Sequence, residues 1–236
     1  MEWGSALFET VNDGVETVTS FISGCEVEYP TSLALDDIDI KAPWPAGHSC
    51  AAGGLIEGGL YYNQQPTHCG SRAFAVDFAR GLSPPNPPTF ELPVLAVYQG
   101  LVTNVRSHIP DNDNTGSANR VKIDHYRPLE SVIAAFEMTI SGKRRRSRYS
   151  SDSLHLRGGN TMPVSEAMWV EQGTRLGEMD NTGLSVYHHL HFEFRDTQDT
   201  RGGFSRPTVM PSPLDSVTLG HDDAGTWITS TNTEVD

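Results

Sequence analysis

The chain has 236 residues, 37% of them hydrophobic, which is enough for one large domain with extensions. Its 17 lysine and arginine residues face 30 aspartate and glutamate residues. The resulting net charge of -13 argues against general affinity for nucleic acid or anionic membranes. No segment approaches the roughly 18 consecutive apolar residues of a membrane helix. We therefore expect a loop-rich, monomeric protein with no nucleic-acid partner and no membrane span.

The N-terminal stretch, residues 1–37, is expected to be an extension outside the main domain. Its apolar residues recur at helical spacing, at Leu7, Val11, Val15, Val18 and Ile22. This spacing predicts an amphipathic helix that packs on the main body. The first basic residue is Lys41, so the positive start and the uninterrupted apolar run of a secretory signal are not visible.

From about Asp36 onward the sequence changes to short β-type runs between clusters of Gly, Pro, Asn and Asp. Examples are "PVLAVYQGLVTNV" at 93–105 and "RVKIDHY" at 120–126, and a proline-rich turn region at 81–93 separates two strand-like segments. This texture predicts a mainly β domain over residues 38–213.

Two further segments differ from this domain in composition. Residues 126–152 look like an insertion, and their basic run "KRRRSR", Lys143 to Arg148, is more simply explained as a solvated loop than as a binding patch. After about Pro213 the apolar content falls, so residues 214–236 are expected to form a loose tail.

The stretch "YHHLHFEF", residues 187–194, concentrates three histidines in four positions. Side chains alternate between the two faces of a strand, so this segment divides into two rows. The apolar row is Leu190, Phe192 and Phe194, and the polar row is His189, His191 and Glu193. The apolar row would anchor the strand in the core, while the polar row presents two imidazoles side by side. His188 would point away from His189, and we expect it to be a bystander at the rim.

The segment "RAFAVDFA", residues 72–79, divides in the same way and leaves Asp77 alone on a face made of alanines. An unpaired buried carboxylate is costly, and a metal ion would give Asp77 a partner. His68 lies nine residues earlier in a turn-like segment and could reach back over the strand. With His191 these residues supply two nitrogens and one oxygen, a donor set typical of catalytic zinc with a fourth position open for water. Other divalent ions are compatible with the same donors.

Several segments occur in an order that resembles a known family. They are "THCGSRAFAVDFA", "PVLAVYQGLVTNV", "NRVKIDH", "SLHL", "WVEQGTRLGEMDNTGLS" and "HLHFEFRD", all within residues 40–196. This order resembles the lysostaphin-type (LytM-like) zinc metallopeptidases, which cut peptide cross-links of bacterial cell walls. The resemblance implies an antiparallel, barrel-sandwich-like β-sheet domain with the active site in a groove on the sheet.

The resemblance also implies roles for five residues of this chain. The metal ligands would be His68, Asp77 and His191, holding one Zn²⁺. His189 would be the general base toward the attacking water, and His155 in "SLHL" would donate a hydrogen bond to the developing charge.

One departure concerns the residues before the last histidine motif. The family usually carries Gly-Pro directly before His-Leu-His, whereas Tyr187 and His188 stand there in this chain. This difference affects the shape of the neighbouring groove.

These observations predict a zinc-dependent endopeptidase that hydrolyses peptide cross-links of bacterial peptidoglycan with metal-activated water, in an extracellular or periplasmic location. The alternative is a non-catalytic module of the same fold that binds peptidoglycan or activates a separate amidase. Such modules typically lose ligand or catalytic positions, and none of the five is lost here, which favours the enzyme. Whether the bond cleaved is glycyl-glycine or a D-amino-acid cross-link, and whether Cys50 pairs with Cys69, is left open by the sequence.

Overall fold

The computed structural model describes three N-terminal segments, residues 8–12, 15–20 and 25–30, and much of the chain from residue 38 onward. From there the described ranges are 38–52, 72, 75–79, 91–111, 116–127, 147–185, 188–197, 208–209, 213–219 and 226–235. No helix in these ranges is long and apolar enough to cross a bilayer.

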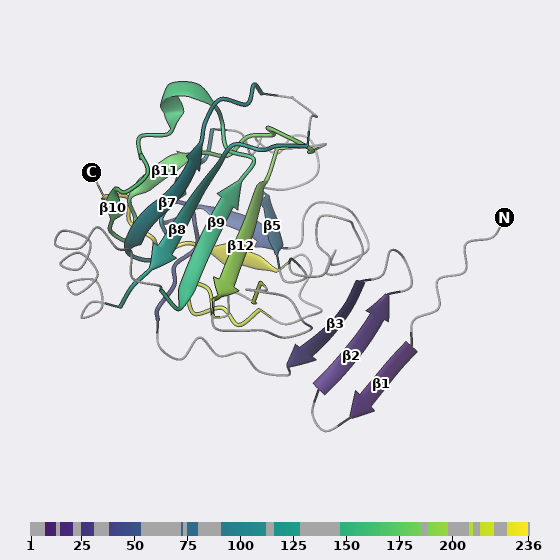
Figure 1. The fold of residues 1–236 in the computed structure, drawn as a ribbon. Coiled ribbons are helices and arrows are strands. Elements are labelled where there is room, and N and C mark those ends of the chain that lie inside the picture. The colour runs from purple at the N-terminus through teal and green to yellow at the C-terminus, as the bar shows by residue number, and fades with distance from the viewer. Residues whose placement is uncertain are drawn as a thin grey trace, which may run out of the picture.

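Antiparallel strands form the main body, as the sequence and the resemblance predicted. The largest sheet has eight strands in the order β10-β7-β8-β9-β12-β5-β4-β13, and all its pairings are antiparallel (Figure 1). In chain order the strands are β4 (Ser49–Ala52), β5 (Val76–Ala79), β7 (Gly100–Arg106), β8 (Arg120–His125), β9 (Tyr149–Leu154), β10 (Trp169–Val170), β12 (Leu190–Asp196) and β13 (Trp227–Thr229). A second sheet pairs β6 (Pro93–Leu95) with β11 (Arg175–Glu178).

The prediction of an N-terminal helix is wrong. A separate three-stranded sheet occupies this stretch, with β1 (Phe8–Asn12), β2 (Val15–Ser20) and β3 (Cys25–Pro30). Valine spacing of three to four residues suited a helix, but the β-branched valines and threonines of "VETVTS" also favour strands. Leu7 and Ile22, which bounded the expected helix, lie outside the described residues.

The C-terminal segment is not a loose tail over its described residues. Strand β13 pairs with β4 through Ile228 and Cys50, and Leu214, Leu219 and Ile228 are buried in the core. The side chain of Asn232 donates hydrogen bonds to the carbonyl oxygens of Ala42 and Ala96 at 3.0 and 3.2 Å. A few apolar residues in a polar segment are therefore enough to dock it on the body.

The expected insertion at 126–152 begins and ends in structured positions. Tyr126 is buried, and residues 149–152 belong to β9, which pairs with β8 on one side and β12 on the other. The basic run up to Arg146 lies outside the described residues, and Arg148 forms an ion pair with Asp196 (Nε–Oδ2 3.2 Å).

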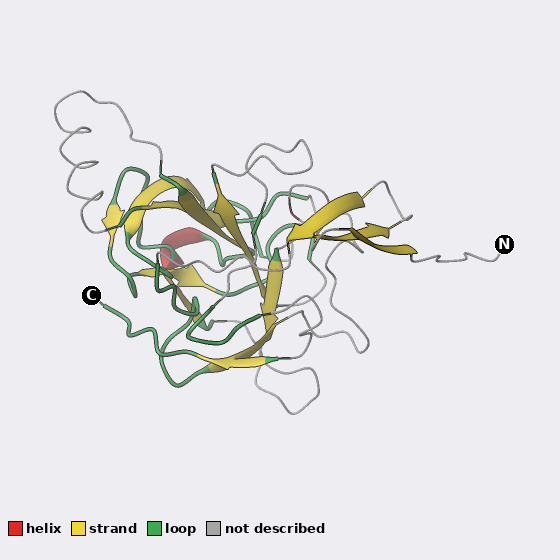
Figure 2. Ribbon diagram, turned by 90° about the horizontal axis from the view of Figure 1, so that it is seen from below, coloured by secondary structure: helices red, strands yellow, loops and turns green. Residues whose placement is uncertain are grey.

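The hydrophobic core joins the two sheets and is rich in aromatic side chains. Phe78 of β5 packs against Trp44 and Phe192, with ring centroids 5.0 and 6.2 Å away. Val94 of β6 and Leu176 of β11 belong to the same cluster. Strands and loops make up nearly all of the described chain, with helical turns confined to short pieces such as Gly159–Thr161 (Figure 2).

One buried polar residue, His125 at the end of β8, also belongs to the core side of the sheet. Its Nδ1 donates to the Gln99 carbonyl at 3.2 Å, its Nε2 accepts from the Ser151 hydroxyl at 2.8 Å, and its ring stacks on Phe194. Burial lowers the pKa of His125 to about 4, against the hydrogen bonds to the Gln99 and Tyr98 backbone, which raise it. The imidazole is therefore neutral at physiological pH.

Candidate metal and catalytic centre

Strand β12 divides its residues between the core and the candidate site. Leu190, Phe192 and Phe194 are fully buried in the hydrophobic core. Because strand side chains alternate, His191 and Glu193 lie on the opposite face, as the sequence predicted. Burying each of the three apolar side chains contributes about 1.5–3 kcal/mol, which fixes the orientation of the polar row.

Asp77 and His191 are direct partners across two neighbouring strands. In the register of β5 and β12 they stand opposite each other, and Asp77 Oδ1 lies 3.0 Å from His191 Nδ1. His189 approaches the same oxygen, with Nε2 at 3.5 Å. Both histidines are buried, so the strand pairing brings Asp77, His189 and His191 together at one buried site.

His155 reaches this point from the end of β9. Its backbone has a φ of 63°, uncommon for a residue other than glycine. Its ring centroid lies 4.6 Å from that of His189 and 5.9 Å from that of His191. The structure therefore brings together four of the five residues expected at the site.

The turn at 180–185 holds both catalytic candidates through hydrogen bonds. His155 Nδ1 donates to the Thr182 carbonyl at 2.6 Å, and the Ser185 hydroxyl lies 3.3 Å from His189 Nδ1. Gly183 has a φ of +79°, and a Cβ there would come within 2.5 Å of the Ser117 carbonyl oxygen. Only glycine fits this close approach, which fixes the turn against the body.

The electrostatic surroundings shift the pKa values of His191 and His155 in opposite directions. Burial favours the neutral form of His191, but hydrogen bonds and charges from Asp77 and Glu193 outweigh it and raise its pKa to about 9. Burial, with His189 and His191 nearby, lowers the pKa of His155 to about 3. Without a metal ion, the His191 ring is therefore protonated near neutral pH, while His155 stays neutral.

The donor atoms at Asp77 and His191 fit a divalent metal ion. Ligand atoms of a tetrahedral zinc lie about 3.3 Å apart when the bonds are about 2.0–2.1 Å, near the 3.0 Å between Asp77 Oδ1 and His191 Nδ1. A carboxylate oxygen and an unprotonated ring nitrogen both accept, so a cation or a proton must lie between them. The described part of the chain holds no group of three side chains arranged for a metal, and His68 lies outside it.

The remaining expected residues have mixed outcomes. Tyr187 lies outside the described residues, like His68 and Cys69. His188 is partly exposed and pairs with Asp180, its Nε2 lying 3.2 Å from Oδ1. Its position beside the centre agrees with a residue at the rim.

Sequence reasoning missed several residues that touch the site histidines. Thr182 and Ser185 lie in the quoted segment "WVEQGTRLGEMDNTGLS", but nothing in the sequence marked them as hydrogen-bond partners. Glu193 was placed on the polar row without a role, although its Oε1 lies 3.3 Å from His191 Nε2. The period of two along β12 was the signal that could have identified it.

Comparisons with known proteins give matches only among solved structures. No protein-family model matches the chain, and no curated protein does. The M23 metalloprotease pseudoalterin from the deep sea has 14% sequence identity and a TM-score of 0.46, covering 80% of this chain and 86% of its own. The catalytic domain of lysostaphin from Staphylococcus simulans has 17% identity and a TM-score of 0.35, covering 74% and 90%.

A third similar structure is the proposed glycyl-glycine endopeptidase LytM from Ruminococcus gnavus. It has 17% identity and a TM-score of 0.42, and the match covers 74% of this chain and 59% of the Ruminococcus chain. The similar solved structures are M23 peptidases and lysostaphin. At these identities and TM-scores, the matches transfer neither a family nor an activity to this chain.

Proposed function

We propose that this chain is a zinc-dependent endopeptidase of the lysostaphin type. His68, Asp77 and His191 would hold the metal, and His155 and His189 would handle protons. The observation that carries the proposal is the convergence of Asp77, His155, His189 and His191, from segments far apart in the sequence, at one buried point.

The proposed reaction is attack of water on a peptide carbonyl. A bound zinc ion would polarise the water and the carbonyl, lowering the pKa of the water toward about 7. The two catalytic histidines would take the proton from the water and support the developing negative charge before a proton passes to the leaving amine.

The hydrogen bonds suggest which histidine accepts a proton from the water and which donates a hydrogen bond to the oxyanion. His155 commits its Nδ1 proton to the Thr182 carbonyl, so the Nε2 of the neutral ring carries a lone pair that can accept a proton. His189 has Nε2 3.5 Å from an Asp77 oxygen and Nδ1 near the Ser185 hydroxyl, which favours a proton on Nε2. We propose His155 as the base and His189 as the donor to the oxyanion, the reverse of the division expected from the sequence.

The proposed substrate is a peptide cross-link of bacterial peptidoglycan, and the proposed location is extracellular or periplasmic. Both follow from the sequence resemblance. The proposed domain limits also stay as expected from the sequence, with 38–213 as the peptidase domain, although 214–219 and 226–235 pack on its body.

The deciding experiment measures metal content and peptide hydrolysis together. The purified chain is expected to carry about one zinc ion and to release new amino groups from purified peptidoglycan. A chelator should abolish the release, and added zinc should restore it. Mass spectrometry of the released muropeptides would identify the bond cleaved.

Other outcomes count against the proposal in different ways. Hydrolysis that a chelator does not affect would reject the metallopeptidase class. Bound zinc without release of amino groups from any defined muropeptide would favour the non-catalytic binding module.

A further inference from the structure

A buried carboxylate, Glu193, lies against the second ring nitrogen of His191. The carboxylate is almost completely buried on β12, two residues after His191 on the same face. Its Oε1 lies 3.3 Å from His191 Nε2, while the other ring nitrogen, Nδ1, faces Asp77 at 3.0 Å. His191 is therefore held at both nitrogens by carboxylates with different surroundings.

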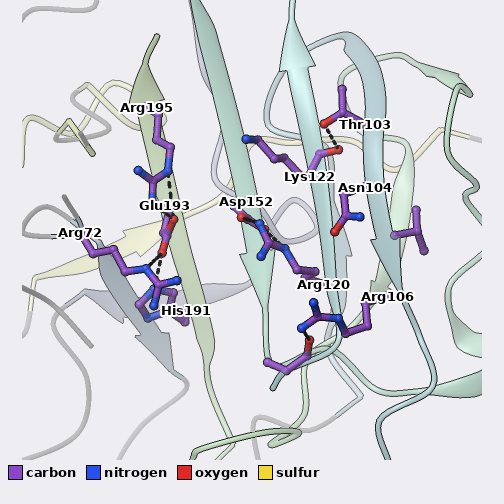
Figure 3. A network of polar contacts seen from close by, with 12 residues as sticks. Arg72, Thr103, Asn104, Arg106, Arg120, Lys122, Asp152, His191, Glu193 and Arg195 are labelled. Atoms are coloured by element: carbon purple, nitrogen blue, oxygen red, sulfur yellow. Dashed lines mark hydrogen bonds and ion pairs between the residues drawn. The ribbon is translucent and has the colours of Figure 1, made fainter. Parts of the chain in front are cut away.

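Two arginines keep Glu193 in place as a negative charge. Arg72 Nε lies 3.1 Å from Oε1, and Arg195 binds Oε2 through Nε at 3.1 Å and through a second guanidinium nitrogen. Figure 3 shows the carboxylate of Glu193 between Arg195 and His191, with Arg72 reaching it from another segment. A buried carboxylate with this many donors is compensated and fixed in orientation.

This arrangement determines which nitrogen of His191 keeps its proton when a metal ion binds. A carboxylate can only accept, so His191 Nε2 must donate to Glu193. Nδ1 faces a second carboxylate, Asp77, and a metal ion bound between these two atoms would replace the proton on Nδ1 and take its lone pair. A carboxylate that orients a metal-binding histidine in this way makes the imidazole a stronger ligand.

We propose that Glu193, fixed by Arg72 and Arg195, is a positioning residue that holds His191 in the tautomer with Nδ1 free to bind a metal ion. This inference rests on the proposed function, because it assumes that His191 is a ligand. It goes beyond that function because it assigns a role to the contact between Glu193 and His191 Nε2.

The test is the zinc affinity of variants, measured by competition with a chromophoric chelator on the whole chain. Glu193→Ala should weaken zinc binding about 10–100-fold, and Glu193→Gln, which keeps the size and one oxygen acceptor, should fall between Glu193→Ala and the unchanged protein. With Co²⁺ in place of zinc, the visible absorption bands should shift in both variants, because the orientation of one ligand changes.

A matched control is Asp152→Asn. Asp152 stands opposite Glu193 on β9, is also buried, and forms its ion pair with Arg120. This variant should lose stability while its zinc affinity and Co²⁺ spectrum stay unchanged. A purely structural role of Glu193 would make the two carboxylate variants behave alike.

Each outcome decides the inference. Zinc affinity of Glu193→Ala within about twofold of the unchanged protein overturns it; if that variant does not fold, unaltered affinity and spectrum in Glu193→Gln do so. If the unchanged protein binds zinc but hydrolyses no peptidoglycan, the proposed activity fails while the affinity ranking still decides the role of Glu193. If it binds no zinc, both fail.

Discussion

His191 lies between two carboxylates, and the one on the neighbouring strand, Asp77, also lies close to His189. Replacing His191 by Ala should reduce bound zinc well below one ion per chain, because a proposed ligand is lost. His189→Ala should keep most of the zinc and lose turnover by about 100-fold or more, because that ring handles protons. Elemental analysis and a peptidoglycan assay check both. Loss of zinc in His189→Ala would move His189 into the ligand set.

The proposed division of proton transfer leads to a second comparison, between glutamine variants. A glutamine amide can donate a hydrogen bond to an oxyanion but cannot act as a base. His189→Gln should therefore keep more activity than His189→Ala, whereas His155→Gln should be as inactive as His155→Ala. The ratios of kcat/KM on one defined muropeptide measure this. The opposite ranking would restore the roles that the sequence suggested.

His125 should make the stability of the protein depend on pH, because its pKa falls from 6.5 to about 4 on folding. A depressed histidine pKa means that the folded state binds fewer protons, so its contribution is complete above the unfolded pKa of 6.5 and is lost as pH falls toward 4. Between about pH 7.5 and about pH 5 the loss is about 2 kcal/mol.

Urea unfolding of zinc-free protein at the two pH values gives the measurement. His125→Gln is the comparison variant, and its stability should change less over the same interval. Equal changes in both proteins would show that His125 accepts a proton when folded as easily as when unfolded.

At the scale of the strand, β12 links core packing to the geometry of the site. Phe192→Ala should lower the free energy of unfolding by about 3–5 kcal/mol, since the ring is fully buried and its loss leaves a cavity. Leu184→Ala is the control, because Leu184 is 60% exposed, and should change stability by about 0.5 kcal/mol or less. Denaturant unfolding of both variants gives the comparison. Similar losses would contradict the packing described here.

The side-chain orientations on β12 were predictable from the sequence, whereas the residues that hold the site side chains in place were not. The two-residue period of Leu190, Phe192 and Phe194 gives the direction of the neighbouring histidines directly. The main-chain oxygen of Thr182, which binds His155, has no sequence signature because every residue carries a carbonyl. Arg72 precedes β5 and pairs with Glu193 of β12, a long-range contact that no local pattern reveals.

Errors in the sequence reading arose where local patterns were ambiguous. Valines three or four apart fit a helix, but β-branched residues in short runs fit a hairpin equally well, and strands β1 and β2 formed. In the C-terminal segment the average composition was polar, yet docking depends on individual residues such as Ile228 and Asn232.

For the whole molecule, strand β13 of the C-terminal segment forms one edge of the large sheet. Ile228→Ala in β13 should cost about 2–5 kcal/mol, because this side chain is fully buried in the core. Its neighbour Trp227 is 55% exposed, so Trp227→Ala should cost about 1 kcal/mol or less. Thermal unfolding of the pair is the measurement. A cost at Ile228 as small as the one expected at Trp227 would mean that the segment is only loosely attached.

The inner position of β12 limits how the length of this chain can change. The strand pairs with β9 along its length and with β5 at its start, so its register is fixed from two sides. Inserting or deleting one residue inside 190–196 would exchange the faces of every residue beyond that point, turning a histidine or glutamate into the core and a phenylalanine toward the proposed metal site. Substitutions in β12 can be graded in effect, but changes of length there should abolish metal binding and folding together.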